Sequence, residues 1–146
     1  MGSTDHLNAT RTSVYFHYFP STVSNWDMAH FGQLYQANNF IKYNFNSEEK
    51  NIQAYGQPTS PQYPLENMNN KNNYTIFLFR GSTDGFISTN DAEILIARLR
   101  DEAGVTVQDH LIQDSQWNHL DFIIGQGAGR LVYDQTLAIL DQFNNE

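Results

Sequence analysis

The stretch Gln116-Trp117-Asn118-His119-Leu120-Asp121-Phe122 decides how the rest of the chain is interpreted. It is a polar loop that ends on a histidine and leads into apolar residues and a glycine-rich turn. Upstream, Tyr74-Thr75-Ile76-Phe77-Leu78-Phe79-Arg80 is a short apolar run of the kind that forms a buried strand. This run leads into Gly81-Ser82-Thr83-Asp84-Gly85, a turn with an acid at its tip. The chain therefore presents a strand, an acid and, further on, a histidine.

Residues 74–146 have the patterns of alternating strands and helices. After the first strand, Asn90 and Glu93 resemble a capping box and predict the start of a helix. A second strand is expected over 105–112 and a last helix over 128–143, where apolar residues recur at three- and four-residue spacing. Such alternation implies an α/β fold with parallel strands. Two strands and two helices cannot cover both faces of a parallel sheet, so we expect the edge of a larger one.

The first half of the chain is expected to be less regular. Residues 1–13 are polar and are interpreted as loose, and 14–20 are an aromatic cluster that ends at a proline. Ser21 and Thr22 offer N-cap oxygens to a helix that runs to about Asn38. Residues 42–73 are rich in Asn, Gln and Pro, and a structureless loop of that length is uncommon inside a compact domain. We therefore expect this segment to lie over a surface that another part of the protein supplies.

Composition and charge exclude several classes of protein. A chain of 146 residues with 40% hydrophobic and 14% aromatic content can form one domain with a real core. A net charge of −8 and a pI near 4.9, without a Lys/Arg cluster, argue against a nucleic-acid partner. No run approaches the roughly 20 apolar residues of a transmembrane segment. With no cysteine and no HxxxH or HxH spacing among the five histidines, we expect neither a metal nor a cofactor.

Two further patterns concern location and modification. Met1-Gly2-Ser3-Thr4-Asp5 has no basic region and no apolar core, so we do not expect it to act as a signal peptide. Asn8-Ala9-Thr10 and Asn73-Tyr74-Thr75 fit the acceptor pattern for N-glycosylation, which would make the protein a glycoprotein. Both matches can also arise by chance in a chain this rich in asparagine.

Asp84 and His119 are the candidate catalytic residues. A carboxylate that meets the Nδ1–H of an imidazole fixes the ring tautomer and stabilises the imidazolium. The order strand–Asp84–helix–strand–His119 is the one in which α/β-hydrolases present the last two members of a Ser–Asp–His triad. The alternative is that Asp84 only favours a turn and that His119 is a half-exposed loop residue. Asp121 is expected to orient the loop through backbone hydrogen bonds rather than to take part in chemistry.

The sequence contains no recognisable nucleophile. The α/β-hydrolase elbow needs G-x-S-x-G, because flanking glycines permit the strained turn that exposes the serine. Gly81-Ser82-Thr83-Asp84-Gly85 has its serine in the wrong place, Gly125-Gln126-Gly127-Ala128-Gly129 has none, and no HGGG-like oxyanion loop occurs. The second glycine run also lacks a Walker-type Lys-Ser/Thr, so it is interpreted as a flexible turn rather than a phosphate cradle.

Residues 116–123 resemble the Asn-His-Leu-Asp-Phe block around the catalytic histidine of the acid lipases, a family that includes gastric and lysosomal acid lipase. Phe79-Arg80-Gly81-Ser82-Thr83-Asp84 is similar to the family's strand that ends in a Gly-x-Asp turn carrying the catalytic acid. Weaker similarity continues upstream: residues 21–40 resemble the cap helix, and 55–63 resemble the Pro/Tyr-rich passage back to the sheet. The similarity covers about residues 12–143.

The resemblance implies a partial α/β-hydrolase fold. Its last two parallel strands and their helices would lie in residues 74–146, preceded by a cap-derived helix and connection in 14–73 and a loose segment in 1–13. The implied reaction is hydrolysis of lipid esters, either triacylglycerols or steryl esters, without a cofactor. Asp84 would be the triad acid, and His119 the general base that activates a serine and later protonates the leaving alcohol.

The family's nucleophile, oxyanion loop, signal peptide and first strands all precede the part present here. The implied partners are therefore a lipid ester substrate and a chain that carries the N-terminal hydrolase half. The family resemblance implies a secreted or lysosomal location. A catalytically inactive remnant acting as a binding or assembly subunit is the alternative. An unrelated small α/β binding domain would require the block at His119 to be a coincidence.

Overall fold

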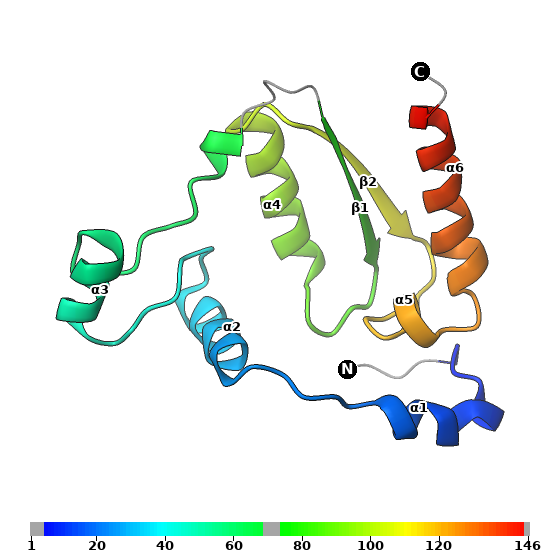
Figure 1. Ribbon diagram of the computed structural model, residues 1–146. Helices are drawn as coiled ribbons and strands as arrows, with labels where there is room; N and C mark the ends of the chain where they lie inside the picture. Colours follow the sequence, from blue (N-terminus) through cyan, green and yellow to red (C-terminus); the bar gives the residue numbers. More distant parts are fainter. Residues whose placement is uncertain (1–4, 69–73, 145–146) are drawn as a thin grey trace. The chain divides into compact units, whose positions relative to one another are not determined.

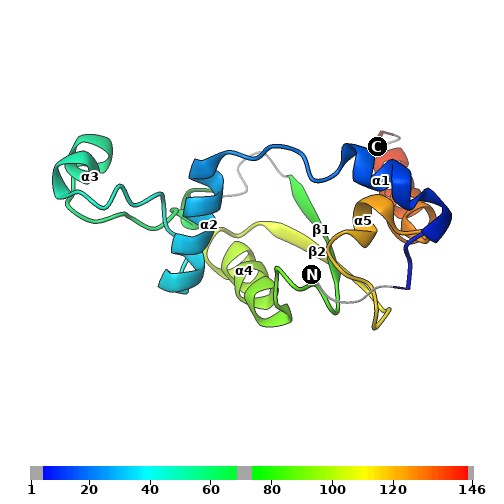
Figure 2. The same ribbon diagram turned by 90° about the horizontal axis from the view of Figure 1, so that it is seen from below.

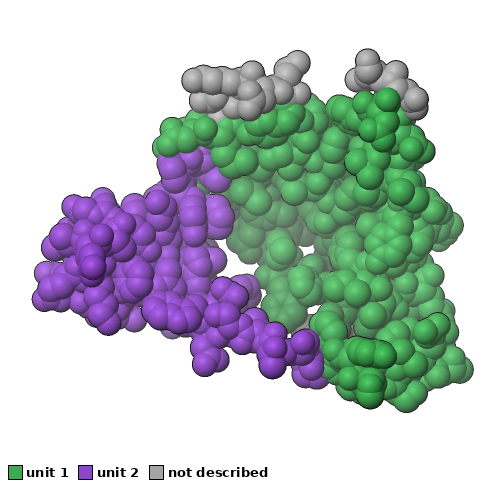
Figure 3. All heavy atoms as spheres, viewed as in Figure 1, with its two compact units in different colours: residues 1–19, 66–146 green, residues 20–65 purple. Residues whose placement is uncertain are grey.

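The computed structural model describes residues 5–68 and 74–144. Within these residues there are six α-helices and two parallel strands, so the fold is mixed α/β. The chain divides into two compact units, one formed by residues 20–65 and the other by 1–19 together with 66–146 (Figure 3). Asn73, in the second glycosylation pattern, lies outside the described residues, and so do Met1 to Thr4. The division into residues 1–13, 14–73 and 74–146 stays a prediction.

The sheet consists of β1 (Thr75–Gly81) and β2 (Thr106–Ile112), which pair in parallel. Thr75 lies opposite Thr106 at one end, and Gly81 lies opposite Ile112 at the other. Helix α4 (Thr89–Asp101) connects the two strands, as the predicted alternation requires (Figure 1). Because the strands are parallel, the loops that follow β1 and β2 leave the sheet at the same edge.

Two apolar clusters cover the two faces of the sheet, because alternate residues of β1 point to opposite sides. The cluster on the α4 side consists of buried residues, with Tyr74, Ile76 and Leu78 packed against them: Ile96, Leu99, Ala103, Val105 and Val107. The cluster on the other side has the same form, with Phe79, Phe122 and Leu131 packed against it: Ile112, Trp117, Ala128 and Val132.

Helix α4 is present where a helix was predicted, but its N-cap was predicted wrongly. Ser88, rather than Asn90, caps the helix. The hydroxyl of Ser88 accepts a hydrogen bond from the Asp91 backbone N–H at 3.1 Å and donates to the Asp91 carboxylate at 2.6 Å. The cap is therefore made two residues earlier, with Asp91 in the place expected for Glu93, but the Asp91 carboxylate accepts the Ser88 hydroxyl rather than the Ser88 backbone N–H of a capping box.

The last predicted helix is confirmed, with a wider first turn. A π-helix, η3 (Gly129–Tyr133), leads directly into α6 (Asp134–Asn144). The rings of Phe143 and Phe77 meet edge to face with 5.6 Å between their centroids, which packs the end of α6 against β1. The short helix α5 (Asp121–Ile124) precedes them and follows the histidine loop.

The beginning of the chain is helical where a loose segment and an aromatic cluster were expected. A 3₁₀ turn, η1 (Ala9–Arg11), runs into α1 (Thr12–Tyr18). Pro20 does not prevent this helix, because its constraint falls on the extended residue Phe19. Figures 1 and 2 both place α1 beside α5. The Asn8 side chain accepts from the Thr10 N–H at 3.1 Å, and glycosylation there stays a prediction.

Residues 20–65 combine polar contacts with contacts between partly exposed aromatic rings. Helix α2 (Asn25–Ala37) begins after the N-cap Ser24 rather than after Ser21 or Thr22, and it ends as predicted at Asn38, which is left-handed at φ 45°. The sequence did not indicate a helix in the Asn-, Gln- and Pro-rich segment that follows, but the eight-residue α3 (Glu48–Tyr55) forms there. Pro58, Pro61 and Pro64 all follow α3 and do not interrupt it.

This segment bonds both to α2, where His30 Nε2 lies 2.8 Å from the Ile41 carbonyl oxygen, and to itself. Ile41 and Gln62 form an antiparallel bridge. The Lys42 N–H donates to the Pro61 carbonyl at 2.9 Å, and the Tyr63 N–H donates to the Phe40 carbonyl at 3.0 Å. The two ends of the segment are thereby joined.

No helix among the described residues has both the length and the apolar character needed to cross a membrane. Nor do residues 5–68 and 74–144 contain three or more His, Cys, Asp or Glu side chains grouped so as to hold a metal ion.

Candidate active site

The acid lies in a turn that immobilises its carboxylate. Asp84 follows β1 by three residues, and its side chain is only 8% exposed. One carboxylate oxygen, Oδ1, accepts the backbone N–H groups of Phe86 at 2.8 Å and Ile87 at 3.2 Å. An ionised carboxylate has no proton to donate and suits this set of donors. These bonds leave Oδ2 facing the histidine loop.

The histidine loop is held by the buried residue Asp121. The Asp121 carboxylate accepts the Asn118 N–H at 2.8 Å, and the Asp121 N–H donates to the Asn118 carbonyl at 3.1 Å. Asp121 and Asn118 are 0% and 2% exposed, and Trp117 beside them is fully buried. The prediction that Asp121 orients the loop through backbone hydrogen bonds is confirmed. His119 is thus a partly exposed side chain on a rigidly held backbone.

Asp84 and His119 meet although 35 residues separate them. The distance from His119 Nδ1 to Asp84 Oδ2 is 3.0 Å. Because the carboxylate can only accept, Nδ1 carries the proton, and Nε2 of a neutral ring is left with its lone pair. The Phe86 ring packs against the imidazole at 4.9 Å, and the His119 side chain is 45% exposed. The expected side-by-side placement at neighbouring strand ends is therefore observed.

Two hydroxyl groups join the acid turn to the histidine loop, and the sequence patterns did not identify them. Ser82 donates to the Asp114 carbonyl at 2.8 Å, and Thr83 donates to the Trp117 carbonyl at 2.9 Å. Hydroxyl residues are common in turns, so neither stood out. The bond made by Ser82 also means that its hydroxyl is directed at Asp114 rather than at His119.

The position opposite Asp84 on the imidazole is open. Among the described residues, no side chain or backbone group forms a hydrogen bond with His119 Nε2. The arrangement can therefore accept a proton at Nε2 and stabilise the resulting imidazolium through Asp84. The serine that would donate such a proton is absent from the motifs of this sequence.

An ion pair braces the two strands near the site. Arg80 Nε and Nη2 each lie 2.8 Å from a different carboxylate oxygen of Asp109. These hydrogen bonds hold the pKa of Asp109 below its ordinary value, and they raise the pKa of Arg80. In the histidine loop, the backbone N–H of Gln116 similarly lowers the pKa of Asp114, with a smaller contribution from His6 at 3.1 Å.

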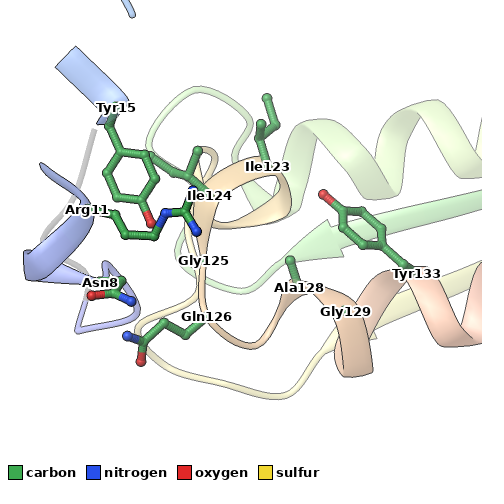
Figure 4. A pocket seen from close by; sticks show the side chains of 10 residues that line it. All are labelled: Asn8, Arg11, Tyr15, Ile123, Ile124, Gly125, Gln126, Ala128, Gly129 and Tyr133. Carbon is green, nitrogen blue, oxygen red and sulfur yellow. The ribbon is translucent and has the colours of Figure 1, made fainter. Parts of the chain in front are cut away.

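A cavity of about 330 Å³ lies between α1 and the turn that follows α5 (Figure 4). The predicted flexible turn over 125–129 contributes to its wall, with Arg11 and Tyr15 on the opposite side. Tyr133, also in the wall, donates its hydroxyl to the Phe122 carbonyl at 2.6 Å. The turn is closely packed rather than loose, since a Cβ on Gly127 would lie 3.1 Å from the Trp117 ring.

The fold and the site together define a class of protein. Parallel strands in a mixed α/β fold carry an acid after one strand and a hydrogen-bonded histidine after the next, which is consistent with part of an α/β-hydrolase. No family model matches the chain.

Comparison with curated proteins shows distant similarity to lipases. The chain is 27% identical to Lipase member N from Mus musculus over 138 residues, which is 94% of this chain and 32% of that protein. It is 26% identical to gastric triacylglycerol lipase from Rattus norvegicus, over 92% of this chain and 32% of that protein. The values for lysosomal acid lipase/cholesteryl ester hydrolase from Rattus norvegicus are 26%, 94% and 32%.

The chain is therefore a distant homologue of the acid lipases, gastric and lysosomal, and the predicted resemblance is confirmed. It spans about a third of the length of these relatives.

Proposed function

We propose that this chain supplies the acid and the histidine, but not the serine, of a hydrolase that cleaves carboxylic esters of lipids. The observation that carries the proposal is the 3.0 Å hydrogen bond between His119 Nδ1 and Asp84 Oδ2. That bond holds the ring in the tautomer whose Nε2 can accept a proton, and Nε2 has no partner among the described residues. Asp84 and His119 are the catalytic residues of the proposal.

The chemistry would proceed as in other Ser–Asp–His enzymes. Nε2 of His119 takes the proton of a serine hydroxyl as the oxygen attacks the ester carbonyl, and Asp84 stabilises the imidazolium that forms. The imidazolium then donates the same proton to the departing alcohol, which leaves an acyl-serine. Water, activated by His119 in the same way, releases the acid and restores the serine. Every proton in this cycle passes through Nε2, so its accessibility is required.

The substrate class rests on homology. Relatives of this chain are named as a triacylglycerol lipase and as a cholesteryl ester hydrolase, so esters of fatty acids with glycerol or sterols are the proposed substrates. The finer fold assignment belongs to the same proposal: residues 74–146 would be the last two strands of the hydrolase core, and 14–73 would derive from its cap. No metal or cofactor is required by this mechanism.

The proposed partner is a polypeptide that carries the rest of the hydrolase core. β1 is apolar on both faces, as a strand inside a parallel sheet is, whereas β2 has the exposed polar residues Gln108 and Asp109. Within the described residues, β1 pairs with β2 alone. An unpaired strand of this kind favours the addition of a neighbour. The chain by itself is therefore expected to associate, and a monodisperse monomer with a single cooperative melt would count against this partner.

Complementation tests the proposal. The chain is mixed with a fragment of gastric lipase that contains its serine motif and ends before the part matched by this chain, and hydrolysis of a p-nitrophenyl ester is followed. We expect activity that neither polypeptide has alone. His119→Ala should abolish it, whereas His17→Ala, which removes an exposed histidine of α1, should leave it within about twofold because it touches no part of the site.

A binding or assembly subunit is the second candidate function. The observation that favours it is the combination of an apolar, singly paired β1 with a sequence that lacks a serine elbow. It predicts that the two polypeptides form a stable complex without turnover. Association without activity, with Asp84 and His119 still hydrogen-bonded, would replace the catalytic proposal with this one.

A further inference from the structure

Three successive residues of the acid turn bond to the histidine loop. Ser82 donates to the Asp114 carbonyl at 2.8 Å, Thr83 donates to the Trp117 carbonyl at 2.9 Å, and Asp84 accepts from His119 at 3.0 Å. The three partners, at positions 114, 117 and 119, follow one another along the histidine loop in the same order as residues 82–84 along the acid turn. The bond between Asp84 and His119 is thus the last of three hydrogen bonds between the two loops, and these three bonds are called the ladder below.

We propose that Thr83 is a positioning residue, whose bond to the Trp117 carbonyl holds Asp84 at hydrogen-bonding distance from His119. The bonds that Asp84 makes to Phe86 and Ile87 lie within its own turn, so they fix its shape and not its distance from the other loop. That distance depends on contacts that cross between the loops, which are the Phe86 ring against the imidazole at 4.9 Å and the hydrogen bonds of Ser82 and Thr83. Thr83 makes the cross-loop bond nearest to Asp84 in sequence.

The loop that receives this bond is fixed, which allows it to act as a reference. Trp117 is 0% exposed and packs in the cluster around Ile112 and Val132. The strand approaches it closely as well, since a Cβ built on Gly81 would lie 2.6 Å from the Trp117 carbonyl oxygen. Glycine at 81 therefore permits the approach that brings the Thr83 hydroxyl within reach of that oxygen.

The alternative is that the Thr83 bond is incidental packing. Thr83 is exposed, so its methyl group adds little to the core. The same kind of bond occurs far from the site in sequence, where Thr136 donates to the Val132 carbonyl at 2.8 Å within η3 and α6. Thr136→Val therefore provides a matched control, because it removes an equally short hydroxyl–carbonyl bond and leaves the two loops untouched.

The experiment uses the full 146-residue chain labelled with ¹⁵N. Long-range ¹H–¹⁵N spectra report the tautomer of His119, and exchange with solvent reports the protection of its Nδ1–H. In Thr83→Val we expect this protection to fall about fivefold, the effect of losing one neutral hydrogen bond, together with a smaller fraction of the Nδ1–H tautomer. Thr83→Ser retains the hydroxyl and should restore both values. Thr136→Val should leave both unchanged.

An unchanged Nδ1–H in folded Thr83→Val overturns the proposal, and so does a failure of Thr83→Ser to restore it. Should Thr83→Val not fold, Ser82→Ala removes the bond to the Asp114 carbonyl instead. This change is expected to reduce the protection of the His119 Nδ1–H about twofold. If Ser82→Ala then leaves protection unchanged, the ladder has no positioning role.

The relevance of this ladder to catalysis rests on the proposed function, but its test does not. Loss of the Nδ1–H signature in Thr83→Val, in a chain that complementation never activates, would support the ladder and reject the hydrolase. Activity in the complemented chain, together with an unchanged His119 Nδ1–H in Thr83→Val, would support the hydrolase and reject the ladder. When both hold, Thr83→Val should lower kcat about fivefold with little change in KM, because binding of the ester does not involve Thr83.

Discussion

Each of the two compact units of this chain is stabilised internally by a different combination of contacts. In the unit of residues 1–19 and 66–146, apolar side chains form a cluster on each face of the sheet. In residues 20–65 the buried side chains are only Asn51 and Leu65. There polar side chains bond to backbone, such as Gln33, whose amide donates to the Asn44 carbonyl at 2.7 Å and accepts the Asn44 N–H at 2.8 Å. Contacts between partly exposed aromatic rings accompany these bonds, such as Trp26 with Tyr43 at 4.7 Å between centroids.

The difference has a consequence for function. A site that consists of a hydrogen bond between two loops needs a rigid support. The apolar unit supplies that support through the buried residue Trp117. The polar unit exposes large apolar side chains on α2, among them Trp26, Met28 and Phe31. Because few of its side chains are buried, this unit is expected to open more readily than the unit that carries Asp84 and His119.

Removal of the Trp117 side chain should produce the largest effect. Trp117→Ala deletes a fully buried indole and leaves a cavity beside Ile112 and Val132, so the free energy of unfolding of that unit should fall by about 4 kcal/mol. Trp26→Ala is the matched change in the other unit, where the indole is 59% exposed, and should cost about 1 kcal/mol. Urea denaturation measures both. Equal losses would show that the two units are not held differently.

Asn51 provides the reciprocal test in the polar unit. It accepts the Phe45 N–H at 3.1 Å and donates to Asn44 Oδ1 at 3.0 Å and to the Pro58 carbonyl at 2.9 Å. Asn51→Leu removes these three bonds, although Asn44 Oδ1 still accepts the Asn46 N–H at 2.9 Å, and should destabilise residues 20–65 by about 2 kcal/mol. Asn25→Ala, at an exposed position of α2, serves as the control. Hydrogen exchange should reveal opening around α3 while the Nδ1–H of His119 keeps its protection.

The same contrast explains what could be predicted from the sequence. The strands, α4, α6 and the order of Asp84 and His119 follow from apolar periodicity, because burial of apolar surface specifies those elements. Helix α3 was missed because Asn and Gln carry no periodic signal, and the carbonyl that an amide such as Asn51 will meet depends on tertiary structure.

Within the site, the same limit separates the residues that were identified from those that were not. Asp84 and His119 were found because chemistry restricts which residue types can form an acid–base pair. Ser82, Thr83 and the N-cap Ser88 act through single hydroxyl bonds that many turn residues could make. Their partners become known only when the two loops are seen together.

The ion pair of Arg80 and Asp109 predicts how the apolar unit responds to acid. Because the pKa of Asp109 is lowered in the folded state, its contribution to stability is present above the unfolded pKa, about 3.9, and is lost as pH falls through the folded value. Unfolding free energy should therefore decline below about pH 5 by about 1 kcal/mol more in the native chain than in Asp109→Asn. Denaturation curves across this range measure the difference, and parallel slopes would contradict it.

The smallest expected effects come from the N-caps, which allow one change to be made in both units. Ser88→Ala and Ser47→Ala each remove a hydroxyl that accepts a backbone N–H, from Asp91 and from Lys50, at a cost of about 1 kcal/mol. Helix α4 is also held by its apolar side, whereas α3 has only Asn51 buried. Amide exchange should therefore accelerate along the whole of α3 in Ser47→Ala but only in the first turn of α4 in Ser88→Ala. Fraying confined to the first turn of both helices would mean that the polar contacts of α3 hold it as firmly as apolar packing holds α4.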